Sequence, residues 1–133
     1  MLTRYLLDTN IASFVIREEA QVVTRFNSIR PEQIFISVIT EAELLFGIAR
    51  KPQATRLARS VQGFLGAIKI AEWTSAAAQH FAQERAVLER AGRLLDDIDM
   101  MIAAHALAED AILVTNDAAF QRITHLRTED WTL

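Results

Sequence analysis

The sequence contains no cysteine, which excludes disulfide bonds, thiolate zinc sites and cysteine nucleophiles. This absence is consistent with a cytoplasmic protein. The sequence also lacks an apolar run long enough to span a bilayer, and residues 1–10 show no signal-peptide pattern. Half of the 133 residues are apolar, which excludes general disorder. We therefore expect one compact domain over residues 1–133, without internal repeats or linkers.

The sequence also has no excess of basic residues, since its net charge is −3. This net charge excludes a generally basic nucleic-acid-binding protein. The charge is uneven, however. Residues 44–71 contain no acid, whereas eleven acids and five arginines follow from Glu72 onward. The basic side chains of the acid-free segment are Arg50, Lys51, Arg56, Arg59 and Lys69. They either bind a polyanion such as RNA beside an acidic, metal-containing site, or form a solvated helix face.

Short apolar runs alternate with stretches of helical periodicity along the chain. The apolar runs predict strands at residues 5–7, 34–36, 68–71 and 111–115, with a possible last strand at 125–127. The helical stretches are 11–17, 18–29, 40–50, 52–66, 75–90, 97–109 and 117–122, with Gly92 predicted to follow the end of the fifth. This alternation predicts a three-layer α/β/α domain with a mostly parallel central sheet.

Four acids lie where predicted strands lead into predicted helices: Asp8, Glu43, Asp99 and Asp117. Strand ends and the following helix starts share one edge of a parallel sheet, so these side chains can converge. Helix N-termini stabilise each carboxylate by only ~0.3–1 kcal/mol, too little to balance their mutual repulsion in a partly desolvated cleft. The cluster therefore needs a cation. All-oxygen ligands favour Mg²⁺ or Mn²⁺, which can activate water and stabilise a phosphoryl displacement.

Several of these residues have alternative interpretations. Asp8 taken alone also suits a plain helix N-cap. Glu41 competes with Glu43, but the two face nearly opposite ways on a helix, and Gly47 leaves room beside Glu43. His105 is a candidate base, yet it lies almost two turns from Asp99, so a packed or surface histidine is the favoured interpretation.

Four segments in order resemble the successive signatures of PIN-domain ribonucleases, and most closely the VapC toxins of bacterial toxin–antitoxin modules. These segments are Leu6–Asn10, Ile39–Gly47, Asp99–Ala106 and Leu113–Asp117, and Leu126–Trp131 resembles the end of many VapC chains. The resemblance implies that Asp8, Glu43 and Asp99 form the core of a metal site with Asp117 as the fourth acid. It also implies that four neighbouring polar residues support these acids: Thr9, Asn10, Thr115 and Asn116.

The same resemblance implies an activity and partners. Members of the family are Mg²⁺-dependent endoribonucleases that cut structured RNA such as tRNA, form dimers, and are inhibited by a VapB antitoxin whose C-terminal segment occupies the cleft. One departure is that Asp96 and Asp97 replace a turn with glycine and proline before the third acid. These two carboxylates either cap the following helix or change metal affinity and repel a phosphate backbone.

The sequence therefore predicts a metal-dependent endoribonuclease, with residues around Arg50 to Arg59 helping to seat the RNA. Two other hypotheses stay open. One is a metal-dependent phosphohydrolase of small phosphate esters. The other is a non-catalytic PIN-fold module that binds a partner.

Overall fold

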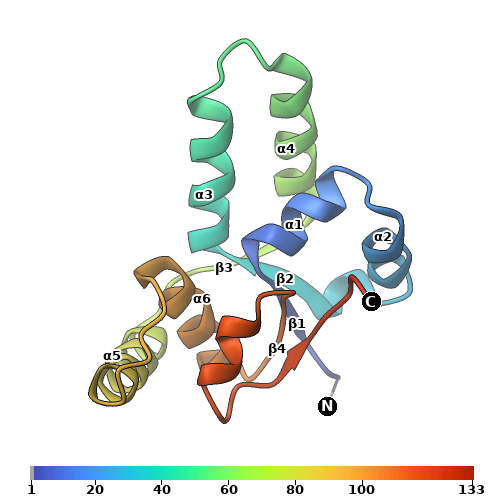
Figure 1. Ribbon diagram of the computed structural model, residues 1–133. Helices are drawn as coiled ribbons and strands as arrows, with labels where there is room; N and C mark the ends of the chain where they lie inside the picture. The colour runs from blue at the N-terminus through green and yellow to red at the C-terminus, as the bar shows by residue number, and fades with distance from the viewer. Residues whose placement is uncertain (1) are drawn as a thin grey trace.

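A fully parallel sheet of five strands forms the centre of the computed structural model, which describes residues 2–133. The strands lie in the order β3-β2-β1-β4-β5, and every neighbouring pair is parallel (Figure 1). Their bounds are β1 Tyr5–Leu7, β2 Ile34–Ser37, β3 Lys69–Ala71, β4 Ile112–Val114 and β5 Thr128–Glu129. The central strand, β1, therefore has a strand on each side.

Helices cover both faces of this sheet and produce three layers (Figure 1). On one side lie α1 (Thr9–Ile16), α2 (Ala20–Asn27), α3 (Val38–Ala49) and α4 (Thr55–Ala67), of which α3 and α4 project from the sheet as a pair. On the other side lie α5 (Ser75–Arg90) and α6 (Asp97–Ala108). Two short 3₁₀ helices, η1 (Pro31–Gln33) and η2 (Ala118–Arg122), complete the chain. Within residues 2–133, no helix is long and apolar enough to cross a membrane.

The side chains of β1 and β2 alternate between two hydrophobic cores, one on each face of the sheet. Leu6 and Phe35 pack with residues of α6, including the fully buried Ala103 and Ala106. Leu7 and its neighbours on the opposite face pack with α1, α2 and α4. The small side chains of α6 let this helix approach the sheet closely. This arrangement confirms the predicted α/β/α fold with a parallel sheet.

Polar side chains at the ends of strands start three of the helices. The carboxylate of Asp8 accepts a hydrogen bond from the Ile11 N–H at 2.8 Å, and the hydroxyl of Ser37 accepts one from the Ile39 N–H at 3.0 Å. Asp117 starts η2 in the same way. Since each cap satisfies a backbone donor that the helix leaves unpaired, the chain turns from strand to helix without a long loop.

The structure corrects three of the predicted boundaries. The last strand is Thr128–Glu129 rather than residues 125–127, because pairing with β4 forms only beyond the predicted run. Helix α4 begins at Thr55 rather than at Pro52, which lies in a turn. Helix α3 begins at Val38, so Glu43 lies in its second turn rather than its first. By contrast, Gly92 follows α5 with a φ of +66°, as predicted.

Candidate active site

The central strand is also the point at which the direction of the sheet changes. From β1 the chain passes to β2 and β3 on one side, whereas β4 and β5 lie on the other side. In parallel sheets this change of direction leaves a crevice at the carboxyl ends of the strands, and ligands bind there. Asp8 directly follows β1, and Asp117 comes shortly after the neighbouring β4. The two aspartates therefore lie at this edge of the sheet, after the two neighbouring strands where the direction changes.

Asp8 is the most deeply buried acid of the group, with 4% of its surface exposed. Burial raises the pKa of Asp8 to about 6, and the negative charges of Asp117 and Glu43 act in the same direction. Hydrogen bonds from the Thr115 side chain and from the Ile11 backbone oppose this shift in the pKa. Asp8 is thus both a helix N-cap and a member of an acidic group, so the two interpretations of this residue are compatible.

Asp99 lies in the first turn of α6 and is half-buried. The pKa of Asp99 is raised to about 7, mainly by burial and next by the charge of the neighbouring Asp96 and a hydrogen bond with it. The charges of Asp117 and Asp8 also contribute to this pKa. Asp96 itself is the N-cap of α6 and accepts a hydrogen bond from the Asp99 N–H at 2.8 Å. Asp97 pairs with Arg85. The structure therefore supports the capping interpretation of Asp96 and gives Asp97 a partner on α5.

Glu43 is held in place from α1. The Thr9 hydroxyl donates a hydrogen bond to the Glu43 carboxylate, and its oxygen lies 3.1 Å from the hydroxyl oxygen of the buried Thr40. Thr9 gives its only hydrogen to Glu43, so Thr40 donates to Thr9. Thr40 is a member of the site that sequence reasoning missed, although its position one turn before Glu43 places both side chains on one face of α3. A Cβ atom at Gly47 would meet nothing within 4 Å, so the space beside Glu43 is open.

The segment after β4 supplies the remaining polar groups. Asp117 accepts a hydrogen bond from the Ala119 N–H at 2.9 Å, and its own N–H donates to the Thr115 hydroxyl at 3.0 Å. Thr115 is buried and connects Asp117 to Asp8. Asn116 is exposed and lines a separate hollow with residues of α1 and α2. The structure therefore places Thr115 among the acids and Asn116 apart from them.

The chemistry of these groups fits a hard divalent cation. The donors are carboxylate oxygens, and no ion pair within residues 2–133 involves Asp8, Glu43, Asp99 or Asp117. Burial is the main cause of the raised pKa values of Asp8 and Asp99, and the repulsion between the acids adds to it. As the side chains stand, however, residues 2–133 contain no group of three or more acids or histidines that could hold a metal ion. We attribute this to the mutual repulsion of the carboxylates and to their separate hydrogen bonds to helix caps and to Thr9.

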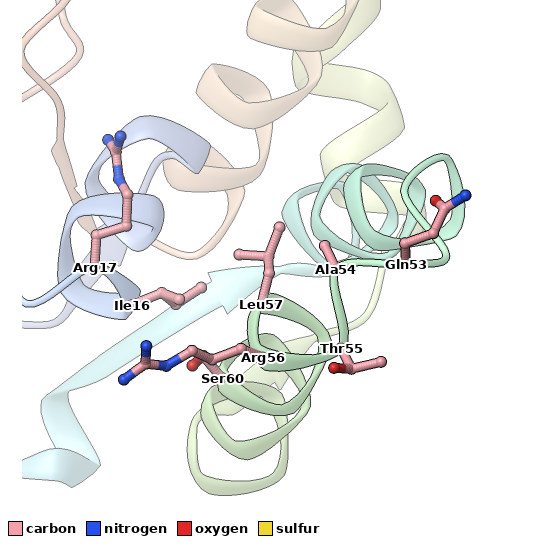
Figure 2. Close-up of a pocket in the computed structure, with 8 residues that line it drawn as sticks. All are labelled: Ile16, Arg17, Gln53, Ala54, Thr55, Arg56, Leu57 and Ser60. Carbon is pink, nitrogen blue, oxygen red and sulfur yellow. The ribbon is translucent and has the colours of Figure 1, made fainter.

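A groove of about 570 Å³ begins beside Glu43 and is lined by positive side chains. Thr9 and Asn10 lie at its acidic end, and the cations along it are Arg17, Arg50 and Lys51. A second hollow of about 580 Å³ lies between α1 and α4 (Figure 2). Figure 2 shows that Ile16 and Arg17 come from the end of α1, whereas Arg56 and its neighbours come from α4 and the turn before it. Arg17 thus lines both hollows.

The remaining basic side chain of interest faces elsewhere. Arg59 lines a hollow on another side of the α3–α4 pair, with Leu45 and Ile48. Lys51 lines this hollow as well as the groove beside Glu43, so Arg59 is the cation that distinguishes the two. Arg17 also lines the groove beside Glu43, although it lies at the end of α1 and outside the acid-free segment. Sequence reasoning missed Arg17 because no other cation stands near it in the chain.

Comparison with known proteins assigns the family. The family model described as PIN domain matches residues 5–126. The chain belongs to the PIN-domain family. A tRNA(fMet)-specific endonuclease VapC of Shigella flexneri is 38% identical to it, with 98% of this chain and all of the relative covered. Ribonuclease VapC2 of Haemophilus influenzae is 36% identical, with 98% and 99% covered. This PIN domain is therefore of the VapC type.

Solved structures agree with this assignment. The VapC-type chain matches a crystal structure of DNA-bound VapBC from Salmonella typhimurium with a TM-score of 0.90 and 34% identity, covering 98% of this chain and 99% of the other. It matches VapBC2 from Rickettsia felis, bound to a promoter DNA fragment, with a TM-score of 0.89 and 30% identity, covering 97% and 99%. The fold and the length of the PIN domain therefore correspond from end to end.

Proposed function

We propose that this PIN-domain protein is a metal-dependent endoribonuclease and the toxin of a toxin–antitoxin pair. The observation that carries the proposal is the group of Asp8, Glu43, Asp99 and Asp117, whose charges act on one another at the carboxyl edge of the sheet. The acids come from different elements and have no ion-pair partner within residues 2–133. Relatives that align over the full length are named as ribonucleases, which supports the same reaction here.

The four acids would hold one or two Mg²⁺ or Mn²⁺ ions. Such an ion, when bound, would make water a better nucleophile at neutral pH and stabilise the charge that develops on the phosphate. The protein's own contribution is positional. Thr9 orients Glu43, Thr115 contacts both Asp8 and Asp117, and the cap at Ile11 fixes the Asp8 carboxylate against the sheet. These contacts reduce the movement that the carboxylates need on binding the ion.

The proposed substrate is structured RNA such as tRNA. One of the full-length relatives is named for tRNA(fMet), which supports this class. Arg50 and Lys51 lie along the groove beside Glu43, where they can contact the phosphates on either side of the cut. Arg56 lies further along, in the hollow shared with Arg17. Arg59 faces away from this path, so its role in seating RNA is the weakest of the four predicted.

The proposed partner is a VapB-like antitoxin. The two solved structures compared above, whose folds match this chain, are VapBC complexes, which supports this partner. The α3–α4 pair exposes large apolar side chains that a partner could cover, namely Leu45, Phe46 and Leu57, and Phe46 is 63% exposed. An antitoxin segment in the groove would block the path to Glu43. A homodimer, or a higher assembly with the antitoxin, belongs to the same proposal.

The test is cleavage of total tRNA by purified, antitoxin-free protein in Mg²⁺, in Mn²⁺ and in EDTA. We expect discrete fragments with either ion and none in EDTA. Asp99→Asn should abolish cleavage. Asp110→Asn is the matched control. Asp110 follows the C-terminal end of α6, away from Asp99, and is an exposed acid paired with Arg127. Its positive φ is one that asparagine tolerates.

Two other outcomes would point to the alternative hypotheses. Intact RNA together with no heat of Mn²⁺ binding in calorimetry would favour the non-catalytic binding module. Intact RNA together with turnover of a chromogenic phosphate ester would favour the small-molecule phosphohydrolase.

A further inference from the structure

A buried histidine joins two elements of the site without belonging to the acidic group itself. His105 lies on α6 and is completely buried. Its Nδ1 lies 2.7 Å from the hydroxyl oxygen of Ser37, and its Nε2 lies 3.0 Å from the carbonyl oxygen of Glu72. The ring of Trp73 meets the imidazole edge-on, with 5.5 Å between ring centroids. Both polar atoms of the ring are therefore satisfied inside the protein.

These contacts fix which nitrogen carries the hydrogen. The carbonyl oxygen of Glu72 can only accept a hydrogen bond, so Nε2 is the donor. Burial lowers the pKa of His105, which keeps the ring neutral with a single hydrogen. Nδ1 is then an acceptor and receives the hydrogen of the Ser37 hydroxyl. Ser37 in turn accepts from the Ile39 N–H at 3.0 Å. The result is one directed chain of hydrogen bonds.

This chain connects the two helices that carry Asp99 and Glu43. Ser37 is the N-cap of α3, and Glu43 comes six residues after it. His105 lies six residues after Asp99 on α6. Helices α3 and α6 pack against each other, and the bond between Ser37 and His105 joins positions 68 residues apart in the chain. Apolar packing alone lets two helices slide by small amounts, whereas a buried, fully satisfied polar network permits one arrangement.

We propose that His105 is a positioning residue that, through Ser37, sets the separation of α6 and α3 and so lets Asp99 and Glu43 bind the same cation. The proposal rests on the proposed metal-dependent nuclease. A displacement of about 1 Å in an active site can lower a rate by about 100-fold. A small shift of either helix would therefore weaken ion binding and catalysis without unfolding the protein.

Two substitutions separate the two bonds of the ring. In His105→Asn, the amide oxygen can take the place of Nδ1 and still accept from Ser37, while the bond to Glu72 is lost. In His105→Gln, the amide nitrogen can take the place of Nε2 and still donate to Glu72, while the bond to Ser37 is lost. His105→Asn leaves the larger void, so a purely structural role would make it at least as damaging as His105→Gln, which is the opposite of the order that the proposal predicts.

The main readout is the affinity for Mn²⁺ in the absence of RNA, measured by calorimetry. We expect the Kd of His105→Gln to rise by about tenfold or more, as for other residues that orient metal ligands. His105→Asn should lose clearly less affinity. With RNA, His105→Gln should lower kcat while leaving KM almost unchanged. Long-range ¹⁵N–¹H NMR of the parent should show a neutral ring with its hydrogen on Nε2. His80→Gln, on α5, is the control.

Ser37→Ala provides a second route if the His105 variants fold poorly. It removes the hydroxyl from the other side and should reproduce the loss of Mn²⁺ affinity, and the double variant with His105→Gln should be no weaker than the worse single variant. Equal effects of His105→Asn and His105→Gln, or a hydrogen on Nδ1, would overturn the positioning role alone. A parent protein that binds no Mn²⁺ would overturn the proposed metal site, and this proposal with it.

Discussion

The Thr9 hydroxyl donates a hydrogen bond to the carboxylate of Glu43 and joins α1 to α3 across the opening of the groove. Thr9 is the first residue of α1, directly after Asp8, whereas Glu43 lies in the second turn of α3. The bond therefore couples the acid on β1's end to an acid 35 positions further along the chain. The Thr40 hydroxyl donates a hydrogen bond to the Thr9 hydroxyl, so the Glu43 side chain is oriented before any ligand binds.

Replacing Thr9 should lower activity through Glu43. Thr9→Val keeps the shape of the side chain but removes the donor, which frees the Glu43 carboxylate and leaves Thr40 without its acceptor. We expect kcat to fall by about 10- to 100-fold, the range for residues that orient metal ligands. Thr9→Ser retains the hydroxyl and should stay within about threefold of the parent. Single-turnover cleavage of tRNA distinguishes them; equal rates for the two variants would show that Thr9 does not orient Glu43.

The stability of the metal-free protein should depend on pH in a defined direction. In the folded state, Asp8 has a pKa of about 6 and Asp99 a pKa of about 7, whereas the ordinary pKa of an aspartate is 3.8. Both groups therefore destabilise the fold as the pH rises from about 4 to about 7. His105 acts in the opposite direction, because its lowered pKa costs stability when the pH falls below 6.5.

The variant Asp8→Asn isolates the contribution of Asp8 to the pH dependence of stability, because His105 is unchanged in it. In EDTA we expect the variant to gain thermal stability over the parent at pH 8. It should lose most of that advantage at pH 4, where folded Asp8 is protonated and an unfolded aspartate, with an ordinary pKa of 3.8, is partly protonated as well. Mn²⁺ should raise the melting temperature of the parent more at pH 8 than at pH 5 and should hardly affect the variant. Thermal scans at the three pH values are sufficient. A variant less stable than the parent at pH 8 would contradict the burial argument.

Asp117 should be more tolerant than Asp8 of the change to asparagine. Its carboxylate caps η2 at the Ala119 N–H, and asparagine caps as well as aspartate does. We expect Asp117→Asn to keep the stability of the parent and a measurable part of its RNA cleavage, whereas Asp8→Asn should cleave no RNA. Asp117→Ala should in addition lose about 1 kcal/mol of stability with the cap. The check is urea unfolding beside tRNA cleavage; complete inactivity of Asp117→Asn would make Asp117 an essential ligand.

The salt dependence of RNA binding should distinguish the arginines that line the groove from Arg59, which does not line it. Within residues 2–133, Arg17, Arg50 and Arg59 form no ion pair. Arg17 and Arg50 line the groove beside Glu43, and Arg59 does not. Arg17→Gln and Arg50→Gln should each weaken RNA binding and reduce the slope of log K against log salt by about 1. Arg59→Gln, which removes the same charge, is the matched control. A slope that changes equally in all three variants would indicate a diffuse charge effect.

The sequence predicted the fold well because the deciding signals are local. Short apolar runs ended by capping residues, as at Leu7 and Asp8, predict a strand that turns directly into a helix, and their alternation leaves few topologies other than a parallel sheet. The last strand was placed wrongly because Thr128 and Glu129 form no apolar run. Their strand character comes from pairing with β4, which is a tertiary effect.

The acids could be proposed from their positions near strand ends, and the family resemblance indicated Thr9 and Thr115 beside them, where the structure has them. The contacts that join distant elements could not be predicted. Asp96 was expected as a cap from its place before α6, and it is one. Arg17 and Thr40 belong to the site through contacts between elements far apart in the sequence, and so does the bond between His105 and Ser37. No periodicity or short motif carries such information. A lone histidine on an apolar helix gives the same pattern whether it serves as packing or as a link.

The separation of the acids along the chain has a consequence for the newly made protein. Asp8 and Asp117 belong to one group although almost the whole domain lies between them. A chain still under synthesis carries Asp8 and Glu43 long before Asp99 and Asp117, and the strand that brings Asp117 beside Asp8, β4, is among the last to be made. Because the domain folds as a unit, the first two acids cannot meet the last two before β4 has been made and has paired with β1.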